Sequence, residues 1–182
     1  MKTTVKKIGL LFIATVISSF ALSCSSSDDG GGGGSAAAGT ITAKVNGTTF
    51  TSMEMVTFAN WTPEYGTLTI QGNTTDKAIV LIMNGVDGPG TYDATSEVSG
   101  VFPVIATYME IEGAASGNPV TTEWVAPYTD SGVVGWVKIA EIEEGGSVKG
   151  TFEFKGRNQD NDSDFRNVTN GSFNIELNAA GW

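Results

Sequence analysis

The sequence contains no histidine, and this absence removes more chemistry than any other feature of its 182 residues. Histidine is the usual general base of enzymes and the commonest metal ligand in proteins. Without it, these residues cannot form a Ser-His-Asp or Cys-His catalytic centre or a histidine-based zinc site. Carboxylate chemistry remains, and glycoside hydrolysis by two Asp or Glu residues is its main example.

Cysteine is almost as scarce, because Cys24 is the only one. A basic start is followed by the apolar residues 8–20 and then by Ala-Leu-Ser directly before Cys24. This order is typical of a secretory signal, and the apolar stretch is shorter than the roughly 20 residues of a membrane span. The segment resembles the lipobox of bacterial lipoproteins, whose cysteine is acylated after cleavage. We therefore expect a signal peptide over 1–23 and a lipid on Cys24, which leaves no thiol for disulfides, metals or catalysis.

The residues after Cys24 lack the apolar side chains needed for a core. Serine, aspartate, glycine and alanine fill 25–39, with five consecutive glycines, so that 24–39 is predicted to be a lipidated, flexible linker. Its acidic pair, Asp28 and Asp29, resembles the short export signals of surface-exposed Bacteroidota lipoproteins. That resemblance implies an outer-membrane protein exposed at the cell surface. The alternatives are a plain solvated linker and a domain that faces the periplasm.

Positive charge is also in short supply. Cleavage before Cys24 would remove Lys2, Lys6 and Lys7 but no acidic residue, so the net charge would fall from −10 to −13. A domain this acidic is repelled by nucleic acid, which we exclude as a partner.

Residues 40–182 contain no sustained helical stripe of apolar residues. Apolar and polar residues instead alternate, as in 148–154, and turns such as Asn46-Gly47 separate the alternating segments. In residues 78–83 both the even-numbered and the odd-numbered positions are apolar, which predicts a central strand covered on both faces. We predict one antiparallel all-β domain, a β-sandwich or a closed or partly closed barrel of about ten strands. The expected strands lie near 40–46, 49–59, 66–73, 77–84, 90–94, 103–112, 121–128, 133–143, 147–157 and 167–178.

Both ends of this domain resemble a known group of sequences. Residues 40–50, with the strands at 148–154 and 168–173, are similar to the ends of an uncharacterised family of Bacteroidota outer-membrane lipoproteins. The resemblance implies the location and an all-β fold. It implies no activity.

Aromatic residues near predicted loops provide the first candidate site. Trp61 and Tyr65 lie in one predicted loop, and Trp124 and Tyr128 flank Pro127. Rings on loops can stack against sugars while neighbouring acids and amides bind hydroxyl groups. The alternative is that these rings cap the ends of the β core.

A calcium loop is the second candidate. Asp160, Asp162 and Asp164 place carboxylates at alternate positions, as calcium loops do. The pattern then departs from an EF-hand, because Phe165 replaces the glycine and Gly171 replaces the glutamate that such a loop needs. The alternative is a polar hairpin loop between two strands, with no cofactor.

The sequence therefore favours a lipid-anchored, non-catalytic binding or interaction module of the cell envelope. Its expected partners are the membrane, through the lipid, and a glycan or another envelope protein. A carboxylate-dependent glycan hydrolase and a purely structural envelope component are the alternatives. Glu110 and Glu112 share one strand face, but spacing alone does not show that carboxyl groups meet across a cleft.

Overall fold

The computed structural model describes residues 35–97, 100–113 and 117–177. The predicted signal peptide, Cys24 and most of the predicted linker lie outside these residues. The described residues belong to one compact unit, residues 32–182. Strands and two short 3-10 turns make up its regular structure, which confirms the predicted all-β class. No helix in this part of the chain has the length and apolar character of a membrane span.

Eleven strands form one antiparallel sheet. They are β1 (Thr40–Val45), β2 (Thr48–Thr51), β3 (Phe58–Thr62), β4 (Thr67–Asn73), β5 (Lys77–Met83), β6 (Gly90–Thr95), β7 (Val104–Glu112), β8 (Val120–Ala126), β9 (Val133–Ile142), β10 (Ser147–Asn158) and β11 (Phe165–Glu176), with 3-10 turns η1 (Glu54–Val56) and η2 (Pro63–Tyr65).

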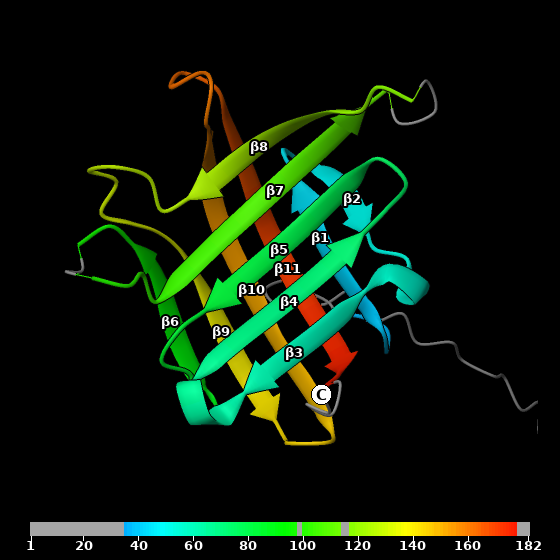
Figure 1. Cartoon of the computed structure of the whole chain (residues 1–182), viewed down its shortest axis with the longest axis vertical. Helices are drawn as coiled ribbons and strands as arrows, with labels where there is room; N and C mark the ends of the chain where they lie inside the picture. Colours follow the sequence, from blue (N-terminus) through cyan, green and yellow to red (C-terminus); the bar gives the residue numbers. More distant parts are fainter. Residues whose placement is uncertain (1–34, 98–99, 114–116, 178–182) are drawn as a thin grey trace, which may run out of the picture. The chain divides into compact units, whose positions relative to one another are not determined.

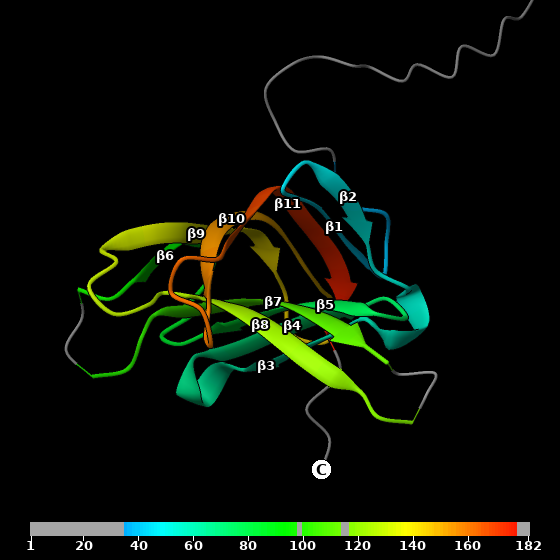
Figure 2. The ribbon, with the colours of Figure 1, turned by 90° about the horizontal axis from the view of Figure 1, so that it is seen from above.

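The sheet curls into a half-barrel of two facing layers. The strand order is β2-β1-β11-β10-β8-β7-β5-β4-β3, and β9 joins β6 to β10. In Figure 1 the layer of β3, β4, β5, β7 and β8 faces the viewer, and Figure 2 shows the other strands as a second layer behind it. The two layers are joined where the last residues of β10, Arg157 and Asn158, pair with Val125 and Trp124 of β8. This arrangement matches the predicted partly closed barrel.

The core fills the space between the layers because alternate residues of each strand point inward. Val148, Phe152 and Phe154 of β10 are buried, and Phe173 of β11 stacks on Phe152 with ring centroids 6.3 Å apart. Burial of these apolar side chains is the main force that holds the layers together.

One predicted strand is wrong. Residues 49–59 form no single strand, since β2 ends at Thr51, η1 follows and β3 begins only at Phe58. Side chains divert the backbone here: Ser52 Oγ accepts a hydrogen bond from the Ile41 N–H at 2.8 Å, and Asn73 Nδ2 donates to the Val56 carbonyl at 2.6 Å. Such side-chain hydrogen bonds to backbone groups elsewhere in the chain compete with the hydrogen bonds of a continuous β-ladder.

The apolar strand β5 is covered on one face only by the described chain. Ile79, Leu81 and Met83 point into the core and are fully buried, whereas Val80 and Ile82 on the other face are only partly buried. The expectation of cover on both faces is therefore not met within this domain.

Candidate functional site

The candidate site lies where the turn between β10 and β11 meets β8. Trp124 of β8 is 2% exposed and packs beside Tyr108 of β7, with ring centroids 5.7 Å apart. Gly156 of β10 permits this approach, because a Cβ atom there would lie 2.7 Å from the Trp124 carbonyl oxygen. The close contact brings the end of β10 against the indole ring.

Asp164 connects the turn to this ring. Its Oδ2 accepts hydrogen bonds from Trp124 Nε1 at 2.9 Å and Asn158 Nδ2 at 3.1 Å, and its Oδ1 accepts one from Arg166 Nη1 at 2.7 Å. Partial burial alone would raise the pKa of the Asp164 carboxyl, but these donors outweigh it and lower that pKa. Asp164 is therefore a fixed negative charge that holds the turn in place.

Arg166 extends the network to the open edge of the space between the two layers. Its guanidinium lies over the Trp124 ring at 4.0 Å from the centroid and 4.0 Å from Glu110 Oε2. Tyr108 donates its hydroxyl to Glu110 Oε1 at 2.8 Å, and burial, with this carboxylate next, raises the pKa of Tyr108. These groups border a hollow of about 340 Å³ that the β1–β2 turn and Lys77 complete.

A larger groove lies next to this cluster, and we call it the outer groove. Its volume is about 530 Å³. It combines aromatic and apolar side chains with planar polar groups, and its lining residues are Ser96, Phe102, Val125, Pro127, Tyr128, Thr129, Asp130, Arg157, Asn158 and Gln159. A mixture of this kind is typical of small-ligand sites, in which apolar surface contributes affinity and a few polar groups fix orientation.

A cation stacked on a ring, Arg157 on Tyr128, forms one wall of the outer groove, and a second such pair adjoins it. The Arg157 guanidinium lies 4.8 Å from the Tyr128 ring centroid, and Lys155 Nζ lies 4.4 Å from that of Phe165. The rings of Tyr128 and Phe165 are 5.8 Å apart. Arg157 also pairs at 3.4 Å with Asp162, whose side chain is 83% exposed. Ring stacking thus positions the guanidinium, while its partner Asp162 is easily displaced because it sits in solvent.

The four predicted aromatic residues do not form one site. Trp61 lies in β3 and Tyr65 in η2, at the opposite end of the domain from the β10–β11 turn (Figure 1). Tyr65 is 73% exposed, whereas Trp61 packs against the core. Trp124 is too deeply buried to act as a stacking platform, because it caps the β core. Of the four, Tyr128 alone lines the outer groove.

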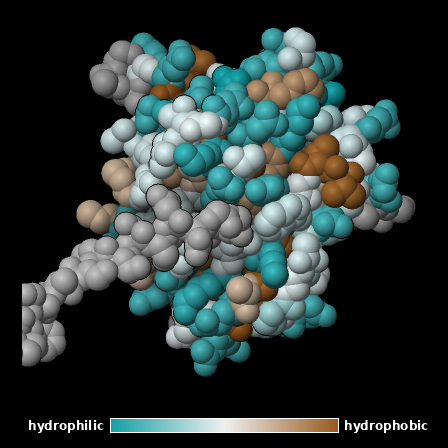
Figure 3. Space-filling view, turned by 180° about the vertical axis from the view of Figure 1, so that it is seen from behind, coloured by the Kyte–Doolittle hydropathy of each residue, from teal (hydrophilic) through white to brown (hydrophobic). Residues whose placement is uncertain are grey.

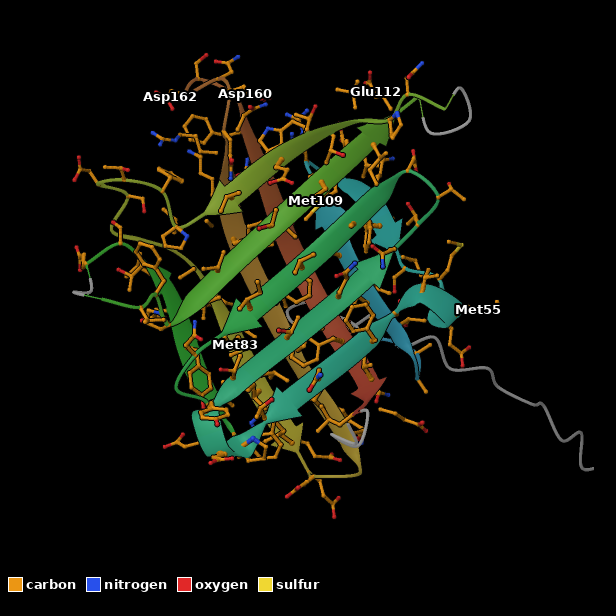
Figure 4. The ribbon with its side chains drawn as sticks, in the orientation of Figure 1. Met55, Met83, Met109, Glu112, Asp160 and Asp162 are labelled. Atoms are coloured by element: carbon orange, nitrogen blue, oxygen red, sulfur yellow. The ribbon has the colours of Figure 1, made fainter. Side chains whose placement is uncertain are left out.

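The three predicted calcium ligands do not converge. Asp160 and Asp162 sit at the tip of the turn (Figure 4), and Asp162 faces Arg157. Asp164 turns inward to its three donors, while Asn158 Oδ1 accepts the Asp160 N–H at 2.8 Å and so shapes the loop. Within the described ranges, no three Asp, Glu, Cys or His side chains are grouped as metal ligands. The geometry is that of a polar hairpin loop.

Sequence reasoning did not identify Arg157, Arg166 or Phe102. The two arginines sit near the ends of predicted strands on either side of one loop, and that placement was the available signal. Their importance depends on Trp124 and Tyr128 lying beneath them, which requires the pairing of β8 with β10. No local pattern reveals that pairing.

The fold and the outer groove define a small half-barrel domain of antiparallel strands with a groove beside the end of β8. The chain belongs to a family of domains of unknown function, since the model of that family, DUF6252, matches residues 37–175. No curated protein and no solved structure matches the chain.

Proposed function

We propose that this protein is a non-catalytic binding module that a lipid on Cys24 attaches to the outer membrane of a Bacteroidota bacterium, facing the cell exterior. Its leader supports the attachment, because a basic start, apolar residues 8–20 and one cysteine stand in the order of a lipoprotein signal. Two or more acyl chains are enough for stable membrane anchoring. The acidic pair Asp28 and Asp29 supports export to the surface.

The ligand that best fits the outer groove is a glycan. The observation that carries this assignment is the meeting of Tyr128, Phe102 and Arg157 in one hollow with the amide of Gln159. Aromatic rings pack against the apolar faces of sugars, and guanidinium and amide groups bind neighbouring hydroxyls in pairs. Phe102 is 37% exposed and Arg157 keeps 27% of its side chain exposed, so both remain accessible.

The lining of the groove favours binding over hydrolysis. Glycoside hydrolysis needs two carboxyl groups that flank one bond, roughly 5 to 9.5 Å apart. Asp130 is the one carboxylate among the described residues that line the groove. Glu110 lies instead in the separate hollow beside Lys77, where its carboxylate contacts the Tyr108 hydroxyl and the Arg166 guanidinium.

A glycan array probed with the purified full chain tests this proposal. We expect binding to particular oligosaccharides that Tyr128→Ala and Arg157→Ala each weaken by about tenfold, or roughly 1.4 kcal/mol. Tyr65→Ala is the matched control, because it removes an exposed tyrosine at the other end of the domain. Gln159→Ala, which leaves the ring stacking intact, should also weaken binding. A silent array, or loss of binding with Tyr65→Ala alone, would contradict the proposal.

A further inference from the structure

Four exposed apolar side chains are close together in one turn, residues 53–58, which we call the η1 tip. They are between 39% and 97% exposed, and they belong to Met53, Met55, Val56 and Phe58. The other large apolar residues exposed in the described chain are spread over η2, the β6–β7 connection and the first residues of β8 and β9. Figure 4 shows Met55 at the outer edge of the domain. A cluster of exposed apolar residues of this kind usually marks an interaction site.

Hydrogen bonds hold the η1 tip in this exposed position. The Met53 N–H donates to the Asn73 carbonyl at 2.8 Å, and Asn73 Nδ2 donates to the Val56 carbonyl at 2.6 Å. Within the turn, the Thr57 hydroxyl donates to the Met53 carbonyl at 2.8 Å. Because the backbone is already fixed, burial of these apolar side chains against a partner would cost little backbone entropy.

The η1 tip lies beside the point where the chain enters the sheet. A Cβ atom at Gly39 would lie 2.5 Å from Glu54 Cγ, and Gly39 and Phe58 border one shared hollow. Residues 25–34 of the predicted linker separate Cys24 from the first described residue. A glycine-rich chain of about eleven residues has an r.m.s. reach of roughly 18 Å. A lipid on Cys24 would therefore hold this corner of the domain close to the bilayer.

We propose that the η1 tip inserts into the surface of the lipid bilayer to which the chain is attached. This inference rests on the lipid at Cys24 that the proposed function assigns. Methionine, valine and phenylalanine side chains gain free energy when they leave water for the apolar boundary of a membrane. Glu54 is the single charged residue of the tip, and its side chain lies back against Gly39. The neighbouring apolar side chains can therefore enter without carrying its carboxylate below the headgroups.

Size and shape favour a bilayer over a protein partner. Stable protein interfaces bury about 800 Å² and roughly 20 to 30 residues on each side, whereas the tip presents four apolar side chains. The tip is also a tight turn at the outer edge of the domain (Figures 1 and 2), since the Val56 N–H donates to the Met53 carbonyl at 3.1 Å. A protein would need a matching hollow for such a projection, whereas a fluid bilayer adapts to it.

The outer surface of β9 and β10 is too charged to enter a membrane in place of the tip. Its outward residues include Lys138, Glu141, Lys149, Glu153 and Lys155. Lys149 and Glu141 pair there at 3.0 Å, and hydrophilic colours cover much of this side in Figure 3. Charged side chains are costly to move into the bilayer. Of these two surfaces, the η1 tip is therefore the one suited to insertion.

Insertion of the η1 tip would leave the outer groove accessible. Ser147 at the start of β10 borders the hollow beside the tip, and Arg157 near the end of β10 borders the outer groove. The strand between them rises about 33 Å. The tip and the groove therefore lie near opposite ends of β10, and a ligand in solution could reach the groove while the tip is buried.

Fluorescence quenching in phosphatidylcholine vesicles that carry the full lipidated chain tests the proposal. Met55→Cys places one thiol on the tip for an environment-sensitive dye. Val101→Cys is the matched control, because Val101 is an apolar residue, 73% exposed, next to Phe102 of the outer groove. We expect lipids brominated on their acyl chains to quench the dye on Met55→Cys about threefold more than the dye on Val101→Cys. Equal quenching at the two positions would overturn the proposal.

A charged variant separates insertion from chance encounter with lipid. Met53→Asp in the Met55→Cys background should reduce the quenching about tenfold, because a carboxylate opposes entry into the bilayer. Val120→Asp replaces a valine that is 64% exposed at the start of β8, and it should leave the quenching unchanged. Met53 is the N-cap of η1, a position that aspartate favours, and circular dichroism checks that both variants fold. Equal effects of the two substitutions would contradict insertion of the tip.

The unmodified chain distinguishes failure of the tip from failure of the anchor. Its single thiol is Cys24, so dye on the unmodified chain would show that Cys24 carries no lipid. That result would refute the attachment and, with it, this inference. A chain that stays on the vesicles while its Met55→Cys dye escapes quenching would overturn the insertion of the η1 tip alone.

Discussion

Two tryptophans of this domain differ in whether the indole N–H has a hydrogen-bond partner. Trp124 Nε1 donates to Asp164, whereas Trp61 Nε1 is buried without a hydrogen-bond partner in the described chain. A buried donor without an acceptor costs roughly 1–3 kcal/mol, and a bond to a charged acceptor contributes about 1.5–3 kcal/mol.

We therefore predict effects of very different size from the same conservative change. Trp124→Phe should lower the free energy of unfolding by about 2–3 kcal/mol, because it leaves Asp164 short of a donor and weakens the Arg166 stack. Trp61→Phe removes the unpartnered N–H and should change that free energy by less than about 1 kcal/mol. Urea titration of both variants measures the difference, and equal losses would contradict the assigned geometry.

Tyr108 provides a prediction in alkaline solution. Its pKa is higher in the folded state than the usual value of about 10, so its contribution to stability is complete below pH 10. The contribution is lost as the pH rises above 10, because the unfolded chain releases this proton first. Tyr108→Phe should flatten the fall of stability above pH 10, as followed by urea unfolding at stepped pH. Tyr65→Phe is the control, and the same flattening in that variant would refute the explanation.

At the scale of elements, the sequence predicts what depends on near neighbours. Alternation and turn residues located most strands, since each strand requires only that successive side chains face opposite sides. The segment 49–59 failed because Ser52 and Asn73 bond to distant backbone groups. The outer groove could not be predicted either, because it also depends on contacts between residues that are far apart in the sequence. Tyr128 and Arg157 meet only because β8 pairs with the end of β10.

The β10–β11 turn illustrates why residue spacing alone does not bring possible ligands together. Its alternating aspartates read as calcium ligands, yet Asn158 and Arg166 use Asp164 to close the hairpin. Carboxylate spacing records only that oxygen atoms are near one another along the chain. Whether they can share a cation depends on the side chains that the fold places opposite them.

At the scale of the whole molecule, the attachment at Cys24 is the prediction that most directly affects location. Fatty-acid labelling should mark the native chain but not Cys24→Ala, which should be released from the membrane or persist as an uncleaved precursor. Ser23→Ala, one position earlier, serves as a control for changes near the cleavage point. Labelling that survives in Cys24→Ala would disprove lipid attachment at this residue.

The short junction between β10 and β8 has a dynamic consequence. Ala59 of β3 pairs with Leu177 as an isolated bridge between the layers. The pairing of β10 with β8 is limited to Arg157 and Asn158, and both residues also border the outer groove. A ladder this brief opens more readily than the long pairings on either side, so its amide protons should be among the first of the interior strands to exchange with deuterium. A ligand bound in the outer groove would contact residues on both sides of this junction. Occupancy of the groove would then slow the local opening of the β8–β10 pairing that amide exchange measures.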